Sequence, residues 1–114
     1  MPLLTAVMQD IDKFKQSSFS KNEIVLNYPN VVEFLSLLGS SSIMVNSWEG
    51  WILYSSGKLG HSQKYQGTVD LFGCTKEQAL EVAKQTIEQA YVEWQKEPEV
   101  EDAQLLFCLS IAED

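Results

Sequence analysis

The chain has 114 residues, of which 45% are hydrophobic and 21% charged, so it is long enough for one folded domain and too short for two. Sixteen acidic residues against eight lysines give a formal net charge of −8, and there is no arginine. Because arginine is the preferred partner of phosphates and carboxylates, this balance argues against nucleic acid, nucleotides and anionic lipid as partners. Solubility alone would also account for the charge.

Three features of the sequence bear on cellular location: the cysteines, the N-terminal residues and the length of the apolar runs. Cys74 and Cys108 are too few for a domain that depends on disulfides, although a single bond between them stays open. The first residues lack the basic region, apolar core and cleavage site of a secretory signal. No apolar run approaches the roughly 20 residues needed to cross a bilayer. We expect a cytoplasmic protein with no membrane association.

The first forty residues predict two helices. Apolar residues from Leu3 to Phe14 recur at three- and four-residue spacing, which predicts an amphipathic helix over the first fifteen residues. Pro29 suits a helix start and Gly39 a helix stop, so the apolar segment between them predicts a second helix. Residues 24–26 fit either a short strand or a buried lead-in to that helix.

The middle of the chain predicts three strands. Residues 43–47 and 51–56 are β-rich runs, and Trp48-Glu49-Gly50 between them has the composition of a hairpin turn. Residues 57–64 predict a polar loop. Residues 66–72 alternate in polarity, as a third strand would.

The last forty residues carry the clearest pattern. Thr75 and Gln78 form a capping box, and Pro98 marks the end of the helix that follows. One apolar stripe runs along this helix, formed by Leu80, Ala83, Ile87, Ala90, Tyr91 and Trp94. Residues 105–111 alternate but are apolar on both faces, which predicts a central strand.

The predicted order is α-α-β-β-β-α-β within a single domain, residues 1–114. We predict an α+β fold, a two-layer sandwich in which an antiparallel sheet of about four strands is packed by the long amphipathic helix. Three strands form a meander, and the helix crosses one face to deliver the last strand into the same sheet.

Catalytic and metal-binding patterns are absent from the sequence. His61 is the only histidine and has no acid within eight residues, and no signature pairs it with a cysteine. The cysteines lie 34 positions apart, and there is no calcium loop, phosphate-binding loop or dinucleotide fingerprint. We predict a protein that is not an enzyme and has no metal site and no cofactor.

Two features remain as candidates for partner binding. The first is an acidic stretch at the end of the long helix, formed by Glu93, Glu97, Glu99, Glu101 and Asp102 and relieved only by Lys96. Fixed negative charge beside a rigid helix end would steer a basic partner, whereas the plainer interpretation is a solvated face.

The second feature is the aromatic set Trp48, Trp51, Tyr54 and Tyr65, together with Glu49. We expect Trp51 and Tyr54 to pack against the long helix. For Trp48 and Tyr65, exposure and burial are both open. Exposed aromatic rings beside acids are typical of interface hot spots, so Trp48, Glu49 and Tyr65 join the predicted partner-binding residues.

A small acidic α/β chain with a tryptophan-bearing hairpin at Trp48-Glu49-Gly50-Trp51, a capped amphipathic helix and a final apolar strand resembles the immunity proteins of bacterial polymorphic toxin systems. Those of contact-dependent growth inhibition are the nearest in style. The resemblance covers the whole chain in size, charge and architecture, and it assigns no individual residues. It implies a cytoplasmic, non-catalytic protein, monomeric in our expectation, that neutralises a basic toxin, commonly a nuclease, by placing acidic side chains in its RNA-binding cleft.

Two alternatives stay open. A secretion chaperone for a bacterial effector is also small, acidic and α/β, and it would be a homodimer with an exposed apolar groove. A small-ligand binder or enzyme would need a concave pocket around His61 and Tyr65.

Overall fold

Two long strands at the centre of the sheet organise the fold. The computed structural model describes residues 2–20, 23–65, 69–71 and 73–113. Strands β2 (Ile43–Leu53) and β5 (Gln104–Glu113) pair antiparallel from Ile43 opposite Glu113 to Leu53 opposite Gln104. The register shifts once, between Val45 and Ser47, so that Val45 and Trp48 both point to the same face.

Shorter strands flank this pair. The order in the sheet is β1-β5-β2-β3, with β1 (Ile24–Leu26) beside β5 and β3 (Leu59–His61) beside β2. Strand β4 (Val69–Asp70) also pairs with β2, at Ser47 and Trp48. Every pairing is antiparallel, and β5 is central, as its apolar residues on both faces predict.

The predicted hairpin at Trp48-Glu49-Gly50 is wrong, because β2 continues through it as one strand. Glu49 and Gly50 pair with Cys108 and Phe107 of β5, which supplies backbone partners along the whole length. Gly50 allows a close approach instead of a turn, since a Cβ there would lie 2.9 Å from the Cβ of Tyr65. The chain turns after Leu53, where Tyr54 N–H donates to Lys58 O at 2.9 Å.

The other strand predictions are partly confirmed. Residues 24–26, which the sequence left undecided, form a strand, so the observed order is α-β-α-β-β-β-α-β. The predicted loop at 57–64 contains β3, including His61. Strand β4 falls inside the predicted third strand, of which residues 66–68 and 72 lie outside the described residues.

The predicted helices are all present. They are α1 (Pro2–Gln16), α2 (Asn30–Leu38) and α3 (Lys76–Lys96). Both hydrogen bonds of the predicted capping box form at the start of α3, since Gln78 N–H donates to Thr75 Oγ1 and Thr75 N–H donates to Gln78 Oε1. None of the helices within the described ranges is long and apolar enough to span a membrane.

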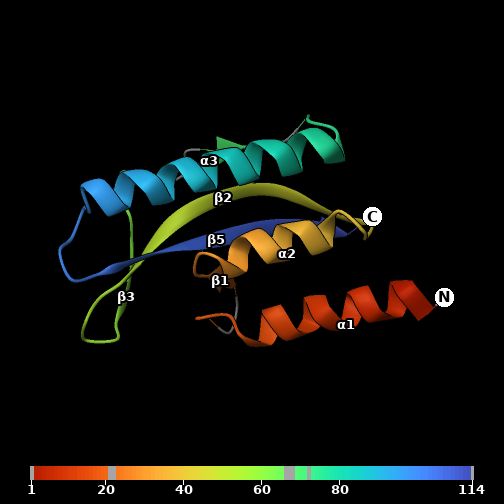
Figure 1. The fold of residues 1–114 in the computed structure, drawn as a ribbon, viewed down its shortest axis with the longest axis horizontal. Helices are drawn as coiled ribbons and strands as arrows, with labels where there is room; N and C mark the ends of the chain where they lie inside the picture. Colours follow the sequence, from red (N-terminus) through yellow and green to blue (C-terminus); the bar gives the residue numbers. More distant parts are fainter. Residues whose placement is uncertain (1, 21–22, 66–68, 72, 114) are drawn as a thin grey trace.

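The helices pack on one face of the sheet and confirm the α+β class (Figure 1). The buried stripe of α3 comprises Ala79, Ala83, Ile87, Ala90 and Trp94. Leu80 and Tyr91, predicted in the stripe, are half-buried at its margin. Helix α2 contacts both α3 and β2, and α1 packs on α2, with the rings of Phe14 and Phe34 meeting edge to face.

The opposite face of the sheet carries a second, smaller apolar cluster of Val25, Trp51, Leu106 and Cys108. Trp51 and Tyr54 were expected to pack against the long helix, and this is wrong. Trp51 alternates with Gly50 and Ile52 along β2 and therefore points away from α3. Tyr54 begins the turn after β2 and is exposed.

Truncation of Ile87 should greatly lower the stability of the fold. This side chain is fully buried between α3 and the sheet, so Ile87→Ala should lower the free energy of unfolding by about 2–5 kcal/mol in urea denaturation. Val92→Ala is the matched control, because Val92 lies on the same helix but is exposed, and its effect should stay within about 0.5 kcal/mol. Equal stability of Ile87→Ala and the parent would contradict the packing of α3 on the sheet.

Candidate functional site: an acidic groove beside α3

Five of the predicted partner-binding residues line two neighbouring pockets beside the C-terminal half of α3. The first, of about 280 Å³, includes Trp48, Tyr65 and Glu93 in its wall. The second, of about 260 Å³, includes Tyr65, Glu97 and Glu99. Lys64 and Tyr65, which follow β3, line both pockets. We call the two pockets together the acidic groove, lined chiefly by Trp48, Lys64, Tyr65, Glu93, Trp94, Glu97 and Glu99.

Aromatic rings form the floor of the groove. Trp48 is 2% exposed and Tyr65 7% exposed. Of the two alternatives that the sequence left open for these rings, burial is the one observed. Trp48 is buried because it lies mid-strand on the helix-covered face, where its Nε1–H donates to Thr86 Oγ1 at 2.9 Å. The rings of Trp48 and Tyr65 lie 6.4 Å apart. Trp94 of α3 lines the second pocket.

Glu93 is a fixed carboxylate on the helix side of the groove. Its Oε2 accepts a hydrogen bond from Tyr65 Oη at 2.9 Å and lies 3.6 Å from Lys64 Nζ. The hydrogen bond from Tyr65 lowers the pKa of Glu93. Burial, together with the nearby carboxylates, raises the pKa of Tyr65 to about 12. Glu93 is therefore charged and Tyr65 neutral at physiological pH.

Glu99 holds residues 62–65 in place. Its Oε1 accepts hydrogen bonds from Ser62 Oγ at 2.8 Å and from the Lys64 backbone N–H at 3.2 Å. Its Oε2 accepts from the Gln63 backbone N–H at 3.1 Å. Partial burial opposes ionisation of Glu99, but these hydrogen bonds outweigh it and lower the pKa. Glu99 thus has a structural task that its place in an acidic run did not reveal.

The remaining acids of the run are exposed. Glu97 caps α3 at its C-terminal end, and Glu101 and Asp102 lie on the turn that leads into β5. Asp102 has a φ of +60°, a conformation that Asp tolerates better than most residues. These carboxylates add to the negative end of the helix dipole, which concentrates negative potential at this end of the molecule.

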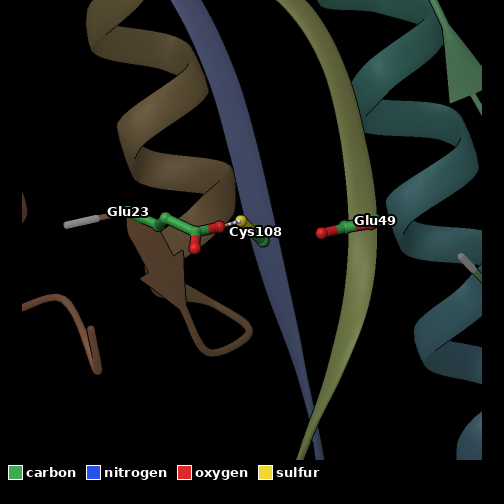
Figure 2. Close-up of side chains that lie close together, drawn as sticks. All are labelled: Glu23, Glu49 and Cys108. Carbon is green, nitrogen blue, oxygen red and sulfur yellow. Dashed lines mark hydrogen bonds between the residues drawn. The ribbon is translucent and has the colours of Figure 1, made fainter. Parts of the chain in front are cut away.

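Glu49, the eighth predicted residue, is separated from the groove by the sheet. Its Oε1 accepts a hydrogen bond from Trp51 Nε1 at 3.2 Å and lies 4.0 Å from His61 Nδ1. Glu23 and Glu49 reach toward Cys108 from either side (Figure 2). One ligand atom from each of these three residues lies within 4.8 Å of the others, the spacing of a metal site.

The thiol of this second cluster is protonated. Cys108 Sγ donates a hydrogen bond to Glu23 Oε2 at 3.2 Å. Burial and the two carboxylates raise the pKa of Cys108, so its thiol is not activated as a nucleophile. Sequence spacing could not reveal this cluster, because it depends on the pairing of Glu49 in β2 with Cys108 in the neighbouring strand β5.

Comparison with known proteins identifies no relative. No protein family matches the chain, and neither a curated protein nor a solved structure matches it.

The hydrogen bonds that Glu99 accepts from residues 62–64 should make a pH-dependent contribution to stability. Its folded pKa is lowered, so the stabilisation is present above its unfolded pKa of about 4.3 and is lost as the pH falls through the folded pKa. Glu99 is exposed, so solvent screens its charge, and Glu99→Gln should lower the free energy of unfolding by less than about 1 kcal/mol at pH 7. The difference from the parent should shrink below about pH 4.

Glu101→Gln is the control for this measurement, since Glu101 is exposed on the same turn. Urea unfolding of both variants at a series of pH values makes the comparison. A Glu99→Gln deficit that does not change with pH would show that the ionised carboxylate is not the stabilising species.

Proposed function

We propose that this protein is a non-catalytic binding protein that captures a basic protein partner in the acidic groove and on the exposed turn beyond it. The observation that carries the proposal is the juxtaposition of carboxylates with aromatic rings: Glu93 and Glu97 line the same two pockets as the largely buried rings of Trp48, Tyr65 and Trp94. Lysine and arginine side chains bind both to carboxylates and to the faces of aromatic rings.

The charge distribution supports a basic partner. The net charge of −8 and the absence of arginine give a field that attracts cations and repels nucleic acid. Glu97, Glu101 and Asp102 extend outward at the helix end, where they speed the encounter with a partner of opposite charge. The groove then provides desolvated contacts, which slow dissociation.

The partner we propose is a bacterial toxin with a basic active-site cleft, probed as a nuclease domain. Carboxylates can occupy a cleft that otherwise holds the phosphates of RNA, and covering that cleft stops the reaction without any chemistry by the inhibitor. This part of the proposal rests on the resemblance in size, charge and architecture to immunity proteins, and it places the action in the cytoplasm.

Growth protection tests the proposal. The open reading frames that flank the gene are expressed one at a time in a bacterial host, with and without this protein. One product should arrest growth, and co-expression of this protein should relieve the arrest. Replacing Glu97, Glu101 and Asp102 with lysine should abolish protection, because it reverses the charge that attracts the toxin.

The matched control replaces Asp10, Asp12 and Glu33 with lysine. These acids lie exposed on α1 and α2, so the net charge changes by the same amount away from the groove. The control should still protect. Protection by both triple variants would reject the acidic surface, and the absence of any toxic flanking product would reject toxin neutralisation.

A further inference from the structure

Lys64 lines both pockets of the acidic groove, with its ammonium near a carboxylate and an aromatic ring. Its Nζ lies 3.6 Å from Glu93 Oε2 and 5.5 Å from the centre of the Tyr65 ring. The side chain forms part of the wall of both pockets. The protein therefore contains its own example of an ammonium bound to this surface.

We propose that Lys64 is an internal stand-in for the partner, and that one arginine or lysine side chain of the partner takes its place on Glu93 and Tyr65 when the complex forms. This inference rests on the proposed function, because it requires a basic partner. It adds a defined subsite and an exchange step to the binding surface.

The geometry of the subsite fits a basic side chain. Tyr65 Oη holds one oxygen of the Glu93 carboxylate, and Gln89 Nε2 lies 3.4 Å from the other. The carboxylate is thus oriented before a partner arrives. The ring of Tyr65 lies below the ammonium, and a cation over an aromatic face is attracted by its quadrupole.

Displacing the Lys64 side chain from Glu93 costs little free energy. The Lys64 and Glu93 side chains are 58% and 42% exposed, and ion pairs with this much solvent contact are weak. The backbone of Lys64 stays fixed during exchange, because its N–H donates to Glu99 independently of the side chain. The side chain can leave while residues 62–65 remain in position.

An arginine would be the stronger occupant. Its planar guanidinium can donate two parallel hydrogen bonds to a carboxylate and can stack on an aromatic ring, whereas an ammonium acts as a point charge. The chain itself contains no arginine, so its internal occupant is the weaker of the two basic side chains. This difference favours displacement by an arginine-bearing partner.

The test compares Lys64→Met with Lys96→Met for binding of a nona-arginine peptide, measured by isothermal titration calorimetry. Each substitution removes one positive charge. Lys64 lines the groove, whereas Lys96, at the end of α3, lines a neighbouring pocket on the other side of Glu93. If Lys64 competes with the peptide, Lys64→Met should bind it about two- to fivefold more tightly than Lys96→Met does. Equal affinities of the two variants would overturn the inference.

A second pair of variants assigns the gain to the subsite. Adding Glu93→Gln to Lys64→Met should cancel the gain, because it removes the carboxylate that the incoming guanidinium binds. Lys64→Gln, which is uncharged but keeps a polar side chain, should reproduce the gain. Persistence of the gain without the Glu93 carboxylate would also overturn the exchange.

The same titrations separate this inference from the proposed function. If the parent does not bind the peptide, or if the lysine replacements at Glu97, Glu101 and Asp102 leave binding unchanged, the proposed function fails. If those replacements weaken binding while Lys64→Met and Lys96→Met behave alike, the proposed function stands and only the exchange step is rejected.

Discussion

The register of β2 against β5 is the constraint on which the rest of the structure depends. Trp48 lies opposite Leu109, Glu49 opposite Cys108 and Trp51 opposite Leu106. Because side chains alternate between the faces of a sheet, this register sends Trp48 under α3 and sends Glu49 and Trp51 to the other face. A slip by one residue would exchange the two sets and remove the floor of the groove.

The groove itself is assembled from three parts of the chain that are distant in sequence. Strand β2 supplies Trp48, residues 62–65 supply Lys64 and Tyr65, and α3 with its following turn supplies the acids. Two carboxylates join these parts, since Glu99 binds the backbone of residues 63 and 64 and Glu93 binds Tyr65 Oη. The acidic run therefore contains two carboxylates that hold the groove together, and its other acids lie exposed at the end of α3 and on the following turn.

The features that the sequence predicted correctly depend on interactions between residues close together in the chain. The capping box fixed the start of α3, and the two-sided apolar run identified β5 as central. Trp48-Glu49-Gly50 misled because glycine after an acid is typical of a turn, whereas this glycine accommodates the side chain of Tyr65. The true turn, at Tyr54–Lys58, lies in the serine- and glycine-containing segment that follows β2.

The candidate site could be predicted only in its composition. The acids and aromatic residues of the groove were recognisable from the sequence, but their division of labour was not. Glu99 and Glu101 are two positions apart and chemically identical, yet only Glu99 meets the backbone amides of residues 63 and 64. The sequence grouped Glu49 with the acids of the groove, but β2 places its side chain on the opposite face of the sheet, near Cys108 and Glu23.

The central claim is that basic ligands bind in the groove and not on the opposite face of the sheet, and the indole N–H signals in a nitrogen–proton correlation spectrum test it directly. Trp48 Nε1–H donates to Thr86 on the groove side, whereas Trp51 Nε1–H donates to Glu49 on the other face. On titration with the nona-arginine peptide, the Trp48 signal should shift progressively while the Trp51 signal stays in place. A shift of the Trp51 signal alone, or of neither signal while calorimetry reports binding, would contradict the account.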